Sequence, residues 1–509
     1  MWNVLFRARD RFAKNQSGNV AILFAFTAVP LIGLLGGAVD VTRHHRYKTE
    51  IANAMDATVV ALARKEPRDD AEADAFVNSY IAPMLPGSGR DKMLHLDAFD
   101  AIKIEGGYRI VTDGYMDTAF LPVVGIQAMA LDLSTEVMTS GGNYEIALAL
   151  DNTGSMAEHD KIGALRLAAN HLTDLLYKDD GATDRVKMAL IPFTTTVNIR
   201  GNAFKPEWLD PSGLGLGAHA LDSYDRAVSR LDIFDALGGG RKGADGLPVL
   251  WKGCVEARAE GYDVDDTVPG SDAATRWTPY LSPDGADEGE GYQKTNSYLV
   301  DRDGSTALER MRNVDKYFPP DITVAFDEEH GPNQACRGPI VELNNDRDRM
   351  HAAINAMQPG GWTHIPEGLA WGWRVLSHEE PFDQGAEYND VDTQKVLVLL
   401  SDGKNTVTET DYTSYGYLAD ARLGLNKFTS KRKLDENTTT LCEAVKAKGI
   451  RLYMVLLEEN DPATQQIFED CASRNLQGEP LYYEVPDADT LTRVFSSIGK
   501  DMTNIHISR

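Results

Sequence analysis

Residues 146–150 are an uninterrupted apolar run, and Asp151, Thr153 and Ser155 follow it at alternate positions. A short apolar run that ends in turn-forming residues predicts a buried strand. A carboxylate and two hydroxyls therefore stand at the carboxyl end of that strand. In open α/β sheets ligands bind at this edge, so the segment favours a parallel sheet with a site at its edge.

Two distant segments supply side chains of the same kind. The apolar run 396–400 leads to Asp402, and Thr363 follows a Gly-Gly-Trp sequence. Carboxylate and hydroxyl oxygens suit Mg²⁺, Mn²⁺ or Ca²⁺ better than a soft metal. Each hydroxyl alone is also a common helix or turn cap, so the prediction depends on their joint occurrence. The expected ligands of a Mg²⁺ or Mn²⁺ ion are Asp151, Thr153, Ser155, Thr363 and Asp402.

From residue 144 onward, strand-like and helix-like segments alternate along the chain. This alternation predicts a mainly parallel sheet with helices on both faces, which is a doubly wound α/β fold. The predicted strands are 145–150, 186–193, 396–400, 450–457 and 481–485. The predicted helices are 161–177, 347–357, 365–376, 436–448, 463–473 and 488–498.

Residues 201–343 interrupt the alternation. They are rich in Gly, Asp and Pro, yet they hold several Trp and Tyr residues, which a disordered segment would lack. This composition predicts a loop-rich insert, long enough to overhang the metal site. The sequence leaves open whether the insert is a lid or a recognition surface.

The four cysteines are Cys254, Cys336, Cys442 and Cys471, and none of them forms a Cys-x-x-Cys pair. An even number outside the cytoplasm predicts two disulfides, with three possible connectivities. We favour Cys254–Cys336 and Cys442–Cys471, because each pair falls within one region of the sequence. Four buried thiols are the alternative for a chain inside the cytoplasm.

Residues 18–41 are almost uniformly apolar and leave about 20 residues between their polar ends, enough to span a bilayer. Basic residues outnumber acidic ones in the preceding tail, which places residues 1–17 in the cytoplasm and the rest of the chain outside. A cleaved secretory signal is the alternative, since residues 25–37 hold small side chains of the kind found at cleavage sites.

Residues 42–66 predict a continuation of this helix, and Pro67 ends it. An apolar stripe at helical spacing favours ordinary packing, although an assembly surface would show the same pattern. Residues 67–142 alternate and are punctuated by turns, which predicts a small β-rich stalk module. Within it, residues 101–111 predict a hairpin with Gly106-Gly107 at the turn. The apolar stripe of the helical extension at 42–66 consists of Ile51, Ala54, Met55, Thr58 and Leu62.

Asp and Glu total 77 against 51 Lys and Arg, which gives a formal net charge of −26. Such an acidic chain repels nucleic acid, so we expect no nucleic-acid partner. The charge suits a soluble exported domain or one that handles cations. No Ser-His-Asp or Cys-His set stands out among the 11 histidines. His364 adjoins Thr363, but we expect it to be a surface histidine.

The Asp-x-Thr-x-Ser segment from Asp151, the distant Thr363 and the later Asp402 together resemble the metal-ion-dependent adhesion site (MIDAS) of von Willebrand factor A (VWA) domains. The one departure is Thr153, where the family has Ser; threonine keeps the hydroxyl and adds a methyl group. The resemblance implies a VWA fold. It also implies that the bound cation accepts a carboxylate from a protein partner.

The N-terminal block carries a second resemblance. Ser17-Gly18-Asn19-Val20-Ala21, then Pro30, then Gly37-Ala38-Val39-Asp40, then Ala54-Met55-Asp56-Ala57 are similar to the N-terminal region of TadG-like proteins of the tight-adherence (Flp) pilus-assembly system. This resemblance implies a single-pass protein of the bacterial inner membrane whose C-terminal domains are periplasmic or extracellular. It implies a protein partner in the pilus-assembly machinery or at the cell surface.

Related pilins are cut after a Gly that has Glu five residues on. In this chain Leu23 stands in that place after Gly18, so we expect a retained anchor. The predicted parts are a cytoplasmic tail at 1–17, a transmembrane helix at 18–41, a helical extension at 42–66, a β-rich stalk module at 67–142, a VWA domain at 143–200 and 344–509, and its insert at 201–343.

Two other functions are compatible with parts of the chain. The segment from Asp151 is also similar to the Asp-Lys-Thr-Gly-Thr loop of P-type ATPases, haloacid-dehalogenase-like phosphoryl-transfer enzymes whose Asp is a nucleophile. The segment from Asp402 lacks the final Asp of that class's second motif. We therefore expect a binding protein rather than an enzyme. A purely structural pilus subunit is the third possibility, and the large C-terminal domain argues against it.

Overall fold

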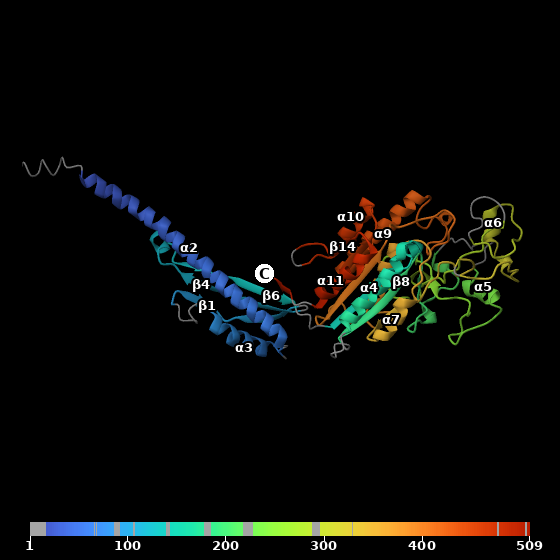
Figure 1. Ribbon diagram of the computed structural model, residues 1–509, viewed down its shortest axis with the longest axis horizontal. Coiled ribbons are helices and arrows are strands. Elements are labelled where there is room, and N and C mark those ends of the chain that lie inside the picture. The colour runs from blue at the N-terminus through green and yellow to red at the C-terminus, as the bar shows by residue number, and fades with distance from the viewer. Residues whose placement is uncertain are drawn as a thin grey trace, which may run out of the picture. The chain divides into compact units, whose positions relative to one another are not determined.

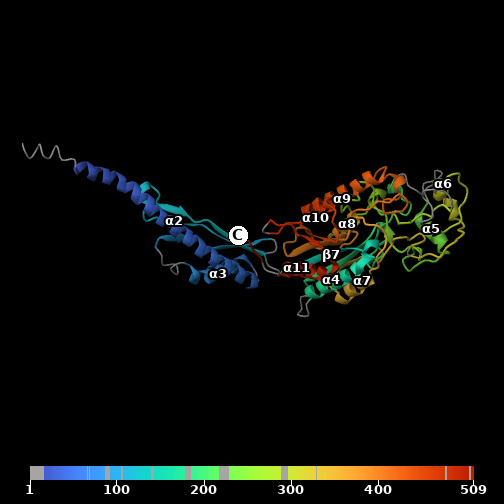
Figure 2. The same ribbon diagram turned by 45° about the horizontal axis from the view of Figure 1, so that its top comes forward.

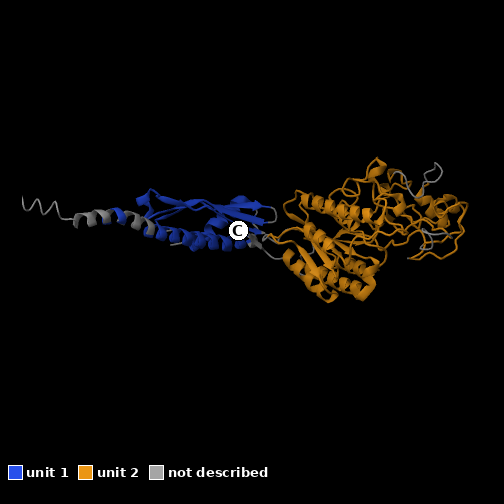
Figure 3. Cartoon of the chain, turned by 90° about the horizontal axis from the view of Figure 1, so that it is seen from above, with its two compact units in different colours: residues 1–141, 504–509 blue, residues 142–503 orange. Residues whose placement is uncertain are grey.

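The chain forms two compact units in the computed structural model, residues 1–141 with 504–509 and residues 142–503 (Figure 3). We call them unit 1 and unit 2. The structure describes residues 17–503 and 506–508, except for 66, 68, 86–91, 105–106, 139–142, 178–184, 217–227, 288–295, 328 and 476–477. The predicted cytoplasmic tail lies outside the described residues, apart from its last position.

One helix, α2 (Ser17–Lys65), begins unit 1 (Figure 1). It ends just before Pro67, which confirms the predicted helical extension. Most side chains of the predicted membrane span, 18–41, lie outside the described residues. In the part of the chain that the structure describes, no helix is both long and apolar enough to cross a membrane.

The apolar stripe of α2 is core packing. Ile51, Met55, Thr58 and Leu62 are all buried, and α2 lies against the strands of unit 1. Asp56 adds a polar contact on the same side, because its carboxylate accepts a hydrogen bond from the Thr135 hydroxyl at 2.7 Å. The stripe therefore packs inside unit 1 and is not an exposed assembly surface.

Unit 1 holds two antiparallel sheets. The predicted hairpin is present, with Ile104 paired to Gly107, and its turn at 105–106 lies outside the described residues. The larger sheet has the order β15-β6-β3-β2, with β2 at Asp100–Ile104, β3 at Gly107–Thr112, β6 at Leu133–Met138 and β15 at His506–Ser508. The smaller has the order β1-β4-β5, with β1 at Leu94–Leu96, β4 at Gly114–Asp117 and β5 at Ala128–Ala130.

Two features of unit 1 differ from the prediction. The β-rich module also contains a helix, α3 (Asp70–Ile81), which Asp69 caps by accepting from the Glu72 N–H. Strand β15 belongs to unit 1, where it pairs with β6, although the sequence predicted the segment up to 509 in the other domain. A three-residue strand after a helix carries too little periodicity to indicate its partner.

Unit 2 is built on a six-stranded sheet with the order β11-β8-β7-β12-β13-β14. All neighbouring strands are parallel except β11, which is antiparallel to β8. The five predicted strands are present, and β11 is an edge strand at the end of the predicted insert. The bounds are β7 (Asn143–Asp151), β8 (Val186–Phe193), β11 (Val341–Asn344), β12 (Thr393–Ser401), β13 (Arg451–Leu457) and β14 (Tyr482–Val485).

Helices cover both faces of this sheet, as the alternation predicted (Figure 2). One face carries α4 (Lys161–Leu176), α7 (Arg347–Ala356) and α11 (Leu491–Thr503). The other carries α8 (Ile365–Leu376), α9 (Lys427–Ala447) and α10 (Pro462–Cys471). Helix α9 begins earlier than the predicted 436, because Asn426 caps it by accepting from the Thr429 N–H.

The insert is loop-rich, with the short helices α5 (Arg230–Leu237) and α6 (Ala307–Arg312) and the two-residue strand β10 (Cys254–Val255), which pairs with β9 (Val197–Asn198). Trp208, Trp251 and Trp277 are fully buried in the same hydrophobic cluster as the strands of the sheet, so aromatic side chains pack the insert onto the core of unit 2. Both predicted disulfides are confirmed. Cys254–Cys336 closes the insert, and Cys442–Cys471 joins α9 to α10.

We expect the double substitution Cys442→Ala with Cys471→Ala to destabilise unit 2. The bridge joins residues 29 apart, and a loop of that length stabilises by about 3–4 kcal/mol through the entropy of the unfolded chain. Urea unfolding followed by tryptophan fluorescence would show the loss as a lower midpoint. An unchanged midpoint would contradict the prediction.

Candidate metal centre

The sheet of unit 2 reverses its winding between β7 and β12. Numbered along the chain, its strands lie in the order 3-2-1-4-5-6, so successive strands proceed outward from β7 on one side and from β12 on the other. A crevice opens at the carboxyl ends of the two strands where an open sheet reverses in this way. Asp151 ends β7 and Asp402 follows β12, and the two strands pair in register as far as Leu150 and Leu400.

The structure places all five predicted ligands together at this edge. The Thr153 hydroxyl lies 3.2 Å from the Ser155 hydroxyl and accepts a hydrogen bond from the Thr363 hydroxyl at 3.2 Å. The Ser155 hydroxyl donates to one carboxylate oxygen of Asp402 at 2.6 Å. The Asp151 carboxylate is fully buried and accepts from the Thr153 N–H at 2.9 Å. Side chains from three distant segments thus form one cluster of oxygen atoms.

Two further residues complete the cluster, and the sequence analysis missed both. The Ser401 hydroxyl donates to the second carboxylate oxygen of Asp151 at 2.6 Å, so both oxygens of that carboxylate are bound. The Lys161 ammonium donates to Asp402 at 2.9 Å and lies 3.6 Å from the Glu458 carboxylate. The position of Ser401 at the end of a predicted buried strand could have indicated that its hydroxyl belongs to the site. No feature of the sequence indicated that Lys161 does.

The charges in the cluster oppose one another. Burial raises the pKa of Asp151 to about 7, and the like charge of Asp402 acts in the same direction. Burial lowers the pKa of Lys161, but the hydrogen bond and charge of Asp402 raise it by more, so its pKa lies above the usual value. One buried ammonium therefore stands against two buried carboxylates, and a cation is the species that would offset the excess.

Backbone contacts hold the Thr363 segment against the Asp151 segment. The Gly154 N–H donates to the Gly361 carbonyl at 3.0 Å, and the Gly360 N–H donates to the Asn152 carbonyl at 2.9 Å. Gly361 adopts a φ of +79°, and a Cβ there would lie 2.9 Å from the Ala335 side chain. Glycine is required at this position by both conformation and space, which explains the Gly-Gly pair ahead of Thr363.

A cavity of about 750 Å³ opens over the cluster. Thr153, Ser155, Thr363 and Asp402 line its floor together with the loops that follow β7 and β12. The insert supplies one wall, so it overhangs the site as its length suggested. The residues it contributes are Glu329, Gln334, Ala335 and Arg337.

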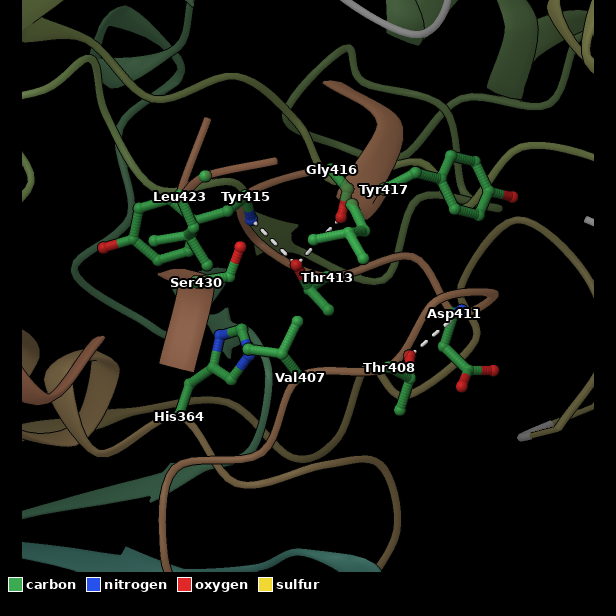
Figure 4. A pocket seen from close by; sticks show the side chains of 12 residues that line it. His364, Val407, Thr408, Asp411, Thr413, Tyr415, Gly416, Tyr417, Leu423 and Ser430 are labelled. Carbon is green, nitrogen blue, oxygen red and sulfur yellow. Dashed lines mark hydrogen bonds between the residues drawn. The ribbon is translucent and has the colours of Figure 1, made fainter. Parts of the chain in front are cut away.

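His364 is not the surface histidine that the sequence predicted. It is fully buried and lines a separate, much smaller pocket, where it lies near Tyr415 and Ser430 (Figure 4). Burial lowers the pKa of His364 to about 4, so the ring is neutral near pH 7. The prediction was wrong because α8, which begins at the next residue, is covered on its outer side too and all its residues are buried.

The donor set suits a hard divalent cation. It consists of carboxylate and hydroxyl oxygens, the ligands that Mg²⁺ and Mn²⁺ prefer. Within the described residues, no group of three or more His, Cys, Asp or Glu side chains is placed to hold a metal ion. The candidate is thus a mixed site of two carboxylates and three hydroxyls.

Comparison with known proteins supports the N-terminal resemblance. Residues 18–64 match a family described as putative Flp pilus-assembly TadE/G-like. The predicted similarity to TadG-like proteins of the Flp system is therefore confirmed for this segment. No curated protein matches the chain.

Several solved structures are similar to the chain at low identity. The pilus adhesin SpaC from Lactobacillus rhamnosus GG aligns with a TM-score of 0.32 and 11% identity, over 82% of this chain and 35% of that one. Proximal thread matrix protein 1 from the mussel byssus gives 0.30 and 10%, over 74% and 49%. The vWF domain of the type V pili tip protein Mfa5 from Porphyromonas gingivalis gives 0.32 and 8%, over 71% and 95%.

The chain thus corresponds to only about a third of SpaC and half of the mussel protein. The VWA-type architecture of unit 2 is recognised from its own strand order and from the position of the Asp151 segment at the reversal point. The N-terminal match and this architecture together agree with a Tad-like pilus protein that carries a VWA-type domain.

We expect Asp151→Asn to change how stability depends on pH in EDTA-treated protein. The folded-state pKa of about 7 lies above the usual 3.8, so the folded wild type holds a proton that the unfolded chain has lost. Wild-type stability should therefore fall, relative to the variant, as the pH rises from about 4 to about 7. Urea midpoints across this range would measure the difference. Parallel pH profiles would contradict it.

We expect Lys161→Met to lower the free energy of unfolding of EDTA-treated protein by about 3 kcal/mol, because it leaves the buried Asp402 carboxylate without its cation. Lys404→Met is the matched control. Lys404 lines the same cavity but is exposed, so its loss should change stability by less than about 0.5 kcal/mol. Equal effects of the two substitutions would contradict the role given to Lys161.

Proposed function

We propose that this chain is a metal-dependent binding protein of Flp pilus assembly. One observation carries the proposal: oxygen-bearing side chains from three distant segments converge at the reversal point of the sheet, on the floor of a cavity. The match of residues 18–64 to the TadE/G-like family supports the pilus context. We further propose that residues 18–41 anchor the chain in the bacterial inner membrane by a single pass, with both units outside the cytoplasm.

The residues that would hold Mg²⁺ or Mn²⁺ are Asp151, Thr153, Ser155, Thr363 and Asp402, directly or through water. The cation would supply a positive charge open to one further oxygen ligand. Around it, Ser401 keeps the Asp151 carboxylate in one orientation, and Lys161 does the same for Asp402. The protein thus presents a fixed set of donors before any partner arrives.

The partner we propose is a protein that presents a carboxylate. The cavity is large enough for a side chain and the backbone around it, and the cluster lies on its floor. Lys404 and Arg337 on the walls offer positive charge to the same group. Wall residues from the insert would then contact the partner on either side of that carboxylate, which gives the insert a part in recognition.

Phosphoryl transfer by Asp151 is the alternative, and the geometry disfavours it. A nucleophilic carboxylate must reach the phosphorus atom with a free oxygen. Asp151 is fully buried, and its two oxygens accept hydrogen bonds from the Thr153 N–H and the Ser401 hydroxyl. Acid-stable labelling of Asp151 by a phosphoryl donor would overturn the binding function.

We expect calorimetry on the full chain in detergent to detect Mg²⁺ or Mn²⁺ binding, and Asp151→Ala to abolish it, since this removes a carboxylate of the donor set. The same substitution should abolish metal-dependent partner binding and piliation. Asp411→Ala is the matched control. Asp411 lines the cavity but lies outside the donor set, so cation binding should persist.

Two outcomes would contradict the proposed function. Cation binding of equal strength in wild type and Asp151→Ala would place the metal elsewhere. Partner binding and piliation that survive Asp151→Ala would show that the site does not serve assembly.

A further inference from the structure

The connection between β4 and β5 in unit 1 is apolar, although it lies on the surface. Residues 119–127, together with Ala128 at the start of β5, read Ala-Phe-Leu-Pro-Val-Val-Gly-Ile-Gln-Ala, without a charge and with one polar side chain. The exposed fractions are 41% for Phe120, 55% for Val123, 55% for Val124 and 46% for Ile126. Surface loops are normally polar, and a contiguous exposed apolar patch of this kind marks an interaction site. We call residues 119–128 the apolar loop.

The apolar loop has a defined conformation. Residues Leu121–Val124 form a 3₁₀ turn that ends at Gly125, whose φ is +90°. Thr118 closes the base, because its N–H donates to the Gln127 carbonyl at 3.0 Å and its hydroxyl donates to the Ile126 carbonyl at 2.6 Å. The apolar side chains are therefore held outward by a rigid turn.

Helix α2 holds this turn in a fixed place. The Asp40 carboxylate, fully buried, accepts from the N–H groups of Ala119, Phe120 and Leu121 at 3.1, 2.8 and 2.9 Å. One turn earlier on the same face, a Cβ at Gly36 would lie 2.4 Å from the Phe120 Cβ. Both positions accommodate the loop. Gly36 leaves space for the Phe120 side chain, and the Asp40 carboxylate provides the hydrogen-bond acceptors.

The level at which the loop meets α2 identifies its partner. A helix rises about 1.5 Å per residue, so the stretch from Gly18 to Gly36 is about 27 Å long, close to the thickness of a bilayer's hydrocarbon core. Phe24, Phe26 and Leu35 on this stretch are exposed by 72%, 78% and 68%. The loop thus adjoins the end of a helix segment whose sequence is apolar and whose described large side chains are exposed, where that segment would leave the bilayer.

The residues beyond this level suit the polar side of a bilayer. Arg43, His44, Arg46 and Lys48 follow within three turns of Asp40, and the ring of His44 hydrogen-bonds the Ala130 carbonyl on β5, the strand that follows the loop. Cationic and imidazole side chains commonly lie at the headgroup level. The apolar loop therefore lies between an apolar helix segment and a cationic one.

We propose that the apolar loop is a second membrane contact, seated in the interfacial region of the outer leaflet beside α2. Val123, Val124 and Ile126 enter the bilayer surface, and the loop fixes unit 1 against the membrane rather than leaving it on a freely rotating helix. The inference rests on the anchor proposed above.

Single added cysteines test this, because all four native cysteines form disulfides. The full chain carrying Val124→Cys, labelled with a nitroxide, is reconstituted into vesicles of phosphatidylcholine and phosphatidylglycerol. Accessibility to oxygen and to a water-soluble nickel chelate is measured by electron paramagnetic resonance. Phe26→Cys reports on the anchor, and Asp113→Cys, exposed at the other end of β4, is the aqueous control. Val123→Cys repeats the test at a neighbouring position.

We expect the labels at Val124 and Val123 to lose most nickel accessibility relative to Asp113, and to gain oxygen accessibility towards the Phe26 value. A Val124 label as open to nickel as Asp113, with Phe26 in lipid, would overturn the loop contact and leave the anchor standing. A Val124 label shielded from both reagents would show a protein partner or second copy and would also overturn it. A Phe26 label open to nickel would overturn the anchor and the loop contact together.

Discussion

The site of unit 2 depends on holding two carboxylates of like charge next to each other inside the protein. Asp151 and Asp402 end up close together because β7 and β12 are parallel neighbours, and neither side chain is exposed to bulk water. Burial and the repulsion between the two charges disfavour the ionised form of Asp151, and its pKa is raised as a result. Neighbouring groups offset part of this cost. The Thr153 N–H and the Ser401 hydroxyl donate hydrogen bonds to Asp151, and Lys161 places a positive charge beside Asp402.

Sequence patterns were enough to predict the frame of unit 2. The apolar runs at 146–150 and 396–400 are short and end in turn-forming residues, which predicts buried strands. The acids after them meet at one edge if the strands are parallel neighbours. The favoured disulfide pairing came from the proximity of each pair in the sequence, and it agrees with this frame because Cys442 and Cys471 lie on consecutive helices that flank β13. These features depend on local composition and on few topological choices.

Other features depend on contacts that no local pattern records. Lys161 begins a helix, and its sequence context is that of a solvent-exposed lysine. In the fold its ammonium forms an ion pair with Asp402. His364 lies beside a predicted ligand, and its burial depends on the loop that follows β12 and on the start of α9, which supply Tyr415 and Ser430 around it. Strand β15 is too short to show a preference for one sheet over another. In each case the deciding partner is distant in the sequence.

Strand β15 has a mechanical consequence. Unit 2 lies in the chain between β6 and β15, two strands that are neighbours in the sheet of unit 1. Unit 2 is thus joined to unit 1 by two chain segments, one at each of its ends. Any force pulling on unit 2 is divided between both segments and enters one sheet through adjacent antiparallel strands. A proteolytic cut in the second segment would leave the two units joined through the first, whereas a cut in the first would leave unit 2 held only by the pairing of β15 with β6.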